Sequence, residues 1–165
     1  MTYDASQITN RIFIGANVTS AQDVADIAAL GITHVVDANT DDEIVLFGND
    51  VQPPRRHPPY IALYSAPTED DGATKAPKWF HGPINFAMGA LAHAGYSILF
   101  HCSDGINRSP SLAYAVMRAQ GWTSADALSL IRSSRPQIAQ ASYGGVRYWP
   151  DAETALKVLG WINVD

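Results

Sequence analysis

The chain has very little cysteine: Cys102 is the single one in 165 residues. One cysteine excludes an internal disulfide and is typical of a protein in a reducing compartment, so we expect a cytoplasmic location. It also excludes a second thiol that could capture an oxidised Cys102 as an intramolecular disulfide. Any cysteine chemistry in this chain must therefore depend on this one residue.

Basic charge is also scarce, because 11 lysine and arginine residues stand against 16 aspartate and glutamate residues, for a net charge of −5. This balance argues against a general nucleic-acid or membrane-surface binder, which would present a basic patch. No apolar run approaches the about 20 residues that a transmembrane helix needs. The first residues lack the regions of a signal peptide. We therefore expect neither nucleic acid nor a membrane as a partner.

The length and the apolar content of 47% fit a single domain over residues 1–165. Proline lacks an N–H and clashes with the preceding turn, so Gly82-Pro83 should break or kink the helix that contains it. The apolar patterns predict strands at 12–14, 33–36, 60–64 and 97–100, a possible strand or turn at 44–47, and helices at 20–30, 78–94, 109–120, 123–134 and 151–159. Parallel strands need such helical crossovers. The order predicts a three-layer α/β/α fold with a mostly parallel central sheet of four or five strands and a helical C-terminal half.

The most informative stretch is 101–109, which reads His-Cys-Ser-Asp-Gly-Ile-Asn-Arg-Ser. A predicted strand leads into it, and Ser109-Pro110 opens an apolar helix. A strand, a tight loop and a helix N-terminus in this order build a cradle for an anion, because backbone N–H groups, the helix dipole and the Arg108 guanidinium surround it. Cys102 at its base is favoured as the thiolate, a nucleophile beneath a bound phosphate. The alternative is a buried, inert cysteine.

The pattern of a cysteine, five residues, an arginine and a serine resembles the signature of the protein tyrosine phosphatase superfamily. Residues 12–15 and 30–37 also resemble the opening strand and the Gly-Ile-Thr-His-Val segment of its dual-specificity branch. Residues 113–117 are similar to the helix behind the signature. The resemblance covers roughly residues 8–138 and weakens past Arg135-Pro136. It implies a phosphatase-like fold and a hydrolase that uses no cofactor and no metal.

The resemblance also assigns roles within the loop. Cys102 would attack phosphorus, and Arg108 would hold two phosphate oxygens through a bidentate fork that lysine cannot copy. Ser109 would help Cys102 to leave, or act as the N-cap of the following helix, and both roles can hold together. His101 would orient the loop by hydrogen bonds, or be a generic histidine at a strand end. The backbone that binds a phosphate-like anion would come from Ser103, Asp104, Gly105, Ile106, Asn107 and Arg108.

Cleavage of a phosphate ester also needs a general acid for the leaving oxygen. In the family this is an aspartate on a loop some thirty residues before the cysteine, and the segment at 66–72 resembles that loop. Asp70 aligns with the acid, and Asp71 stands where an aromatic residue is usual. We favour Asp70 over Asp71, with Glu69 as a third possibility. A merely solvated acidic loop is the alternative.

The loop has no lysine, whereas relatives that act on phosphoinositides carry lysines there to hold further phosphates. A polyanionic inositol lipid is therefore a poor candidate substrate, and triphosphate-capped RNA is disfavoured for the same reason. Arg55-Arg56-His57 lies in a variable region. It could hold an acidic peptide flank or a second phosphate, although a solvated loop is the more common meaning of such a cluster.

These observations predict a cysteine-dependent phosphatase that acts on phosphotyrosine, and also on phosphoserine and phosphothreonine, in proteins or peptides. One alternative is a catalytically weak phosphate-binding module, although such relatives usually lose the cysteine, the arginine or the acid. Another is a phosphatase of RNA 5′ phosphates, sugar phosphates or nucleotides. A sulfur transferase or an arsenate reductase is disfavoured, because arsenate reduction usually needs further thiols and the loops of both classes lack the Gly-x-x-Arg-Ser ending.

Overall fold

The computed structural model describes residues 2–40 and 61–163, together with the backbone of residues 56–57. The strands are β1 (Ala5–Gln7), β2 (Ile12–Gly15), β3 (His34–Asp37), β4 (Arg56–His57), β5 (Ile61–Ser65) and β6 (Ile98–His101). The helices are α1 (Ala21–Ala29), α3 (Pro77–Leu91), α4 (Arg108–Ala119), α5 (Ser124–Ser134), α6 (Pro136–Gln140) and α7 (Trp149–Val158), with a 3₁₀ turn η1 (Ser142–Gly144) before α7. None of the described helices is long and apolar enough to cross a membrane.

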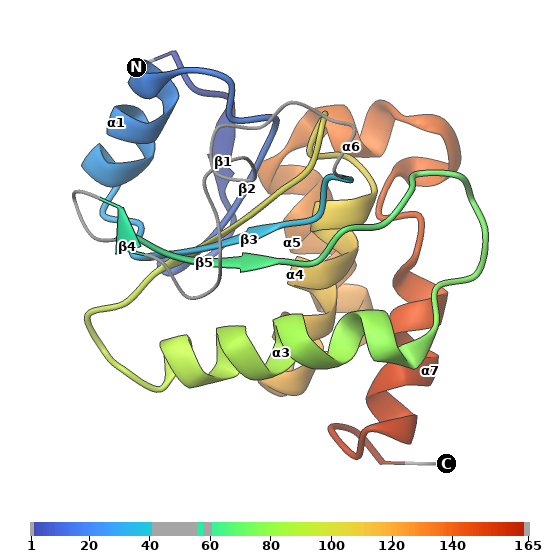
Figure 1. Ribbon diagram of the computed structural model, residues 1–165. Helices are drawn as coiled ribbons and strands as arrows, with labels where there is room; N and C mark the ends of the chain where they lie inside the picture. Colours follow the sequence, from blue (N-terminus) through green and yellow to red (C-terminus); the bar gives the residue numbers. More distant parts are fainter. Residues whose placement is uncertain (1, 41–55, 58–60, 164–165) are drawn as a thin grey trace.

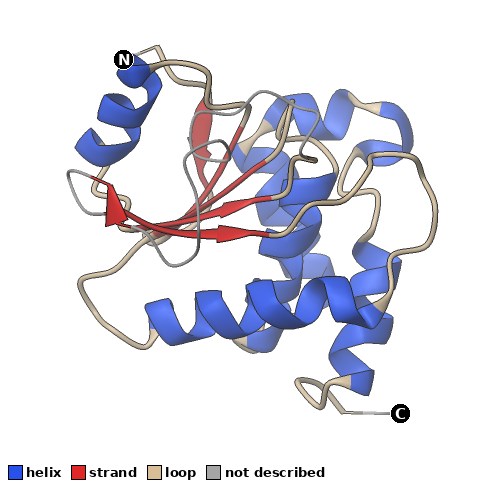
Figure 2. Cartoon of the chain, viewed as in Figure 1, coloured by secondary structure: helices blue, strands red, loops and turns tan. Residues whose placement is uncertain are grey.

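The strands form one twisted sheet in the order β1-β2-β6-β3-β5-β4 (Figure 2). The four central strands pair in parallel, and β1 and β4 join the two edges in antiparallel orientation. The predicted α/β fold with a mostly parallel sheet is confirmed. Two edge strands of three and two residues, too short to leave a periodic pattern, extend the sheet to six strands.

Each face of the sheet carries its own apolar core, which gives the three predicted layers (Figure 1). Helix α1 covers one face, where Ile27 packs with Phe13, Val35 and Leu99. Helices α3, α4, α5 and α7 belong to the layer on the other face, whose core includes Ile14 and Phe100. Strands β2 and β6 are buried along their whole length because they are covered on both sides.

The sheet register places the ends of the parallel strands at one edge. Gly15 and Asp37 both lie level with His101, the last residue of β6. Ligands of open α/β sheets bind outside the carboxyl ends of the strands. The cysteine-containing loop leaves β6 at this edge and ends at the first turn of α4, so the fold presents it where a ligand can reach.

The expected break at Gly82-Pro83 is wrong, because α3 runs without interruption from Pro77 to Leu91 with Pro83 inside it. Pro83 is one of the buried residues of this helix. A Cβ at Gly82 would lie 1.7 Å from the Tyr64 hydroxyl oxygen, so the glycine permits close packing of α3 on β5. The possible strand at 44–47 lies outside the described residues.

Asp26 ties the N-terminal segment to α1. Its Oδ2 accepts hydrogen bonds from the backbone N–H groups of Thr2 (2.8 Å) and Tyr3 (3.0 Å), and its Oδ1 accepts from the Gln22 side chain (2.9 Å). These donors, the Gln22 amide first, lower the pKa of Asp26 to about 2. The ionised carboxylate is therefore favoured in the folded state.

We expect this carboxylate to stabilise the fold fully above its unfolded pKa of about 4, and to lose its contribution as the pH falls toward about 2. Asp26→Asn should be less stable than the wild type at pH 6, with the difference shrinking to near zero by pH 2. Urea unfolding midpoints of both proteins across this range measure the effect. Asp126→Asn, at an exposed position, is the control. A constant difference between wild type and Asp26→Asn at every pH would contradict the assignment.

Candidate active site

Cys102 lies at the base of the loop that joins β6 to α4, and the residue is 3% exposed. Its backbone N–H donates to the carbonyl of Gly15 at 3.4 Å, which anchors it to the neighbouring strand β2. Its Sγ lies 3.2 Å from the Ser109 hydroxyl. Because α4 begins at Arg108 with Asn107 at its N-cap position, the N-cap role considered for Ser109 is wrong, and its hydroxyl contacts the thiol instead.

Gly105 shapes the loop. Its φ is +68°, in the left-handed region that favours glycine, and a Cβ there would lie 2.7 Å from the Gly15 carbonyl oxygen. This bend leaves the amides of Asp104, Gly105, Ile106 and Asn107 without a protein acceptor in the described part of the chain. Open N–H groups in a short loop at a helix N-terminus provide the donors that an anion requires.

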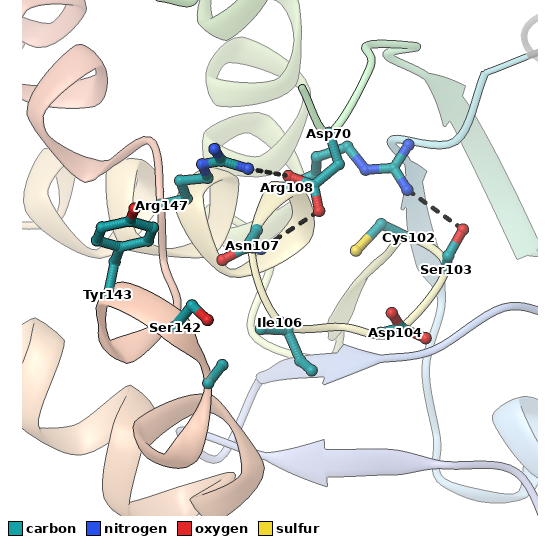
Figure 3. A pocket seen from close by; sticks show the side chains of 11 residues that line it. Asp70, Cys102, Ser103, Asp104, Ile106, Asn107, Arg108, Ser142, Tyr143 and Arg147 are labelled. Carbon is teal, nitrogen blue, oxygen red and sulfur yellow. Dashed lines mark hydrogen bonds and ion pairs between the residues drawn. The ribbon is translucent and has the colours of Figure 1, made fainter. Parts of the chain in front are cut away.

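Arg108 supplies positive charge at the same site, and the residue is only 5% exposed (Figure 3). Its Nη2 donates to the Ser103 hydroxyl at 3.2 Å, within the loop. Its Nη1 donates to the carbonyl of Thr68 at 3.0 Å, in the acidic segment that was singled out in the sequence. The guanidinium therefore connects the loop that contains Cys102 to the segment at 66–72, which contains the predicted general acid.

Asp70 and Asp71 point to different surroundings. Asp70 lines the pocket: its Oδ2 accepts from the Asn107 side chain at 3.2 Å, and its Oδ1 lies 3.9 Å from Nη1 of Arg147. Asp71 instead pairs with the buried Lys75 at 2.9 Å, whose hydrogen bond lowers the pKa of Asp71. Asp71 is therefore engaged by Lys75 and is not among the residues that line the pocket. Glu69 is exposed and is not among the residues that line the pocket.

His101 is fully buried at the end of β6. Its Nε2 lies 3.7 Å from Oδ1 of Asp37 on the adjacent strand β3. Burial lowers the pKa of His101, with the Asp37 carboxylate opposing that change, so the neutral imidazole is favoured at pH 7. The His101 side chain therefore brings no positive charge to the start of the loop, and its role in orienting the loop stays a prediction.

The pocket above Cys102 has a volume of about 420 Å³ and includes residues that the sequence argument did not select. Tyr143 and Arg147 line it from the segment between α6 and α7, and Tyr143 is 87% exposed. No periodicity or motif marks these residues, because the family pattern weakens before them. The lining residues are Asp70, Cys102, Ser103, Asp104, Ile106, Asn107, Arg108, Ala141, Ser142, Tyr143 and Arg147.

Among the described residues, no three His, Cys, Asp or Glu side chains come together as a metal site. Arg55 lies outside the described residues, and Arg56-His57 are described only by the backbone of β4. The rim role considered for this basic cluster therefore stays a prediction from the sequence.

A buried thiol, a buried arginine and four open backbone amides therefore lie together at the edge of the sheet. The family model described as "Dual specificity phosphatase, catalytic domain" matches residues 12–144. The chain belongs to this family, and its domain is a phosphatase-type catalytic domain.

Solved structures of similar fold include human DUSP28, which is 20% identical with a TM-score of 0.72 over 97% of each chain. The human tyrosine phosphatase-like serine/threonine/tyrosine-interacting protein is 18% identical with a TM-score of 0.72, over 95% of this chain and 98% of that one. PTPMT1, solved in complex with PI(5)P, is 14% identical with a TM-score of 0.69, over 94% and 98%. At these identities the likeness is one of fold.

Proposed function

We propose that this protein is a cysteine-dependent protein phosphatase that hydrolyses phosphotyrosine, and also phosphoserine and phosphothreonine, through a thiophosphate intermediate. The observation that carries the proposal is the position of the Cys102 thiol beneath four open amides and beside the Arg108 guanidinium. Donors of this kind are complementary to the charge on a phosphoryl group in transfer. The Asp70 carboxyl faces the same pocket.

In the first step the Cys102 thiolate forms an S–P bond while the P–O bond to the leaving group breaks. Asp70 gives its proton to the departing oxygen, so that an alcohol or phenol leaves rather than an alkoxide or phenoxide. In the second step water attacks phosphorus, its proton passes to the Asp70 carboxylate, and the S–P bond breaks. Ser109, 3.2 Å from the sulfur, donates a hydrogen bond to the thiolate that leaves. Inorganic phosphate is released and the enzyme is restored.

The charge of the pocket supports a protein substrate over an inositol lipid. The loop offers Asp104 where a further phosphate would need a cation, and it has no lysine. Arg147 is a basic side chain that also lines the pocket, but its guanidinium lies 3.9 Å from the Asp70 carboxylate, which offsets its charge. Initial rates on phosphotyrosine, phosphoserine and phosphothreonine peptides, and on PI(5)P in mixed micelles, test the substrate class. Faster turnover of PI(5)P than of every peptide would contradict the proposal.

The proposed acid can be separated from its neighbour by two matched variants. Asp70→Asn should lower kcat for a phosphotyrosine peptide by about 10²- to 10⁴-fold and flatten the basic limb of the pH–rate profile, because the proton donor is lost. Asp71→Asn changes the same charge and should leave both nearly unchanged. Steady-state rates from pH 5 to 8 measure both effects. If Asp71→Asn flattens the profile and Asp70→Asn does not, the assignment of the acid is wrong.

A further inference from the structure

Tyr148 connects the acid-bearing loop to the helix behind the cysteine. The residue is 1% exposed, and its hydroxyl donates a hydrogen bond to Oδ1 of Asp70 at 2.8 Å. The same hydroxyl accepts a hydrogen bond from the backbone N–H of Gly72 at 3.0 Å. One buried oxygen therefore holds both the Asp70 carboxyl and the backbone two residues beyond it.

The backbone of Tyr148 is fixed from the other side. Its N–H donates to the hydroxyl of Ser111 at 3.1 Å, and Ser111 in turn donates to the carbonyl of Asn107, the N-cap residue of α4. The ring lies under Nζ of Lys75, 4.8 Å from the centroid, and packs edge-on against Trp79. Tyr148 is thus held in place independently of Asp70.

We propose that Tyr148 is a positioning residue for the general acid: it occupies Oδ1 of Asp70, so that the reactive proton is carried on Oδ2. Oδ2 accepts a hydrogen bond from Nδ2 of Asn107 at 3.2 Å, so it faces the anion-binding loop. The inference rests on the proposed function of Asp70 and adds a residue from the segment where the family resemblance fades.

The chemistry of the tyrosine suits this role. The carbonyl oxygen of a protonated carboxyl is its stronger acceptor, whereas the hydroxyl oxygen donates its proton and keeps a weaker capacity to accept, which the Asn107 amide uses here. A phenol O–H fixed on Oδ1 therefore favours the proton on Oδ2. Burial raises the pKa of Tyr148 to about 12, so the phenol keeps its proton throughout the pH range of a phosphatase assay. After proton transfer the same O–H stabilises the carboxylate that forms, and Arg147 lies near the same oxygen.

The test uses two aryl phosphates that differ in their need for an acid. Phenyl phosphate has a poor leaving group, whereas 2,4-dinitrophenyl phosphate has a good one. For Tyr148→Phe we expect kcat to fall about tenfold on phenyl phosphate, the scale of one lost hydrogen bond, and to change less than twofold on the dinitrophenyl ester. Inhibition by inorganic phosphate should be unchanged, since the loop that binds it keeps its donors.

Tyr114→Phe is the matched control, because Tyr114 is another buried tyrosine whose hydroxyl bonds a side chain, Ser124, 2.8 Å away and outside the pocket lining. It should not change the ratio of the two rates. In the Asp70→Asn background, Tyr148→Phe should have no further effect on that ratio, because a positioning residue acts only through the group it positions.

Each result has one meaning. Equal losses on both esters for Tyr148→Phe would reduce the tyrosine to a structural residue and overturn the inference, while leaving the proposed function intact if Asp70→Asn still discriminates between them. If Asp70→Asn lowers the rates on the two esters equally, the assignment of the acid and the inference are both wrong. The inference is supported if Tyr148→Phe and Asp70→Asn each lower kcat on phenyl phosphate more than on the dinitrophenyl ester, and if the double variant shows no further change in the ratio of the two rates.

Discussion

Cys102→Ser should lower kcat for an aryl phosphate by up to about 10⁶-fold, the effect typical of removing a covalent nucleophile from a hydrolase. A serine hydroxyl in this position would need a base to activate it, and the side chain that contacts Cys102, Ser109, is itself a hydroxyl. The open amides and Arg108 are untouched, so the variant should still bind inorganic phosphate. Hydrolysis of the aryl phosphate from pH 5 to 8 and calorimetric titration with phosphate measure the two properties separately.

The outcome separates the proposed mechanism from the alternatives. Loss of turnover with retained phosphate binding supports a thiolate nucleophile. Turnover by the serine variant at a rate near that of the wild type would remove the covalent mechanism. A chelator should leave the wild-type rate unchanged, because none of the proposed steps uses a metal. A wild type that is folded and reduced, binds phosphate and yet hydrolyses no phosphate ester would favour the phosphate-binding module considered from the sequence.

The second large effect is expected at Arg135, a fully buried arginine that holds the underside of the cysteine loop. Its Nε donates to the carbonyl of Gly105 at 2.9 Å, and its Nη2 donates to that of Asp104 at 2.8 Å. The guanidinium also forms a two-pronged ion pair with Asp4, at 2.8 and 2.9 Å, beside strand β1. One side chain thereby joins the loop to the edge of the sheet.

Arg135→Ala should lower the free energy of unfolding by about 3–5 kcal/mol, because it leaves two loop carbonyls unsatisfied and a cavity behind them. For a domain of this size that is a fall in Tm of roughly 6–20 °C. Thermal unfolding followed by circular dichroism measures it. The stability of Arg135→Lys should fall between those of the wild type and Arg135→Ala, since a single ammonium cannot reproduce the planar fork of the guanidinium.

Arg132→Ala is the matched control, because Arg132 lies in the last turn of α5, the helix that Arg135 caps. Its Nε donates to one carbonyl, that of Gly144, at 2.9 Å in a partly buried position. We expect Arg132→Ala to lower the free energy of unfolding by about 1 kcal/mol or less. Equal losses for the two alanine variants would mean that the loop does not depend on Arg135. A greater loss for Arg135→Ala, together with lowered phosphatase activity in the folded protein, would support its role beneath the loop.

The fold class and the loop of the candidate site could both be predicted from the sequence, because each depends on residues close together in the chain. Residues 97–120 contain a strand, a tight loop and a helix in direct succession, and the spacing of Cys102, Gly105 and Arg108 marks the loop locally. The alternation of strands and helices limits the pairing to a mostly parallel sheet. The edge strands were missed because segments of two and three residues carry no measurable period.

The tertiary structure decided which side chains meet at that site. Asp70 and Asp71 are equivalent acidic neighbours in the sequence, and they differ because one faces Asn107 and the other faces Lys75. Tyr148 lies 78 residues from Asp70, and Arg135 lies 131 residues from Asp4. Such contacts leave no trace in local composition or periodicity. They arise only when the packing of helices on the sheet brings distant segments within hydrogen-bond distance, which is why they had to be read from the structure.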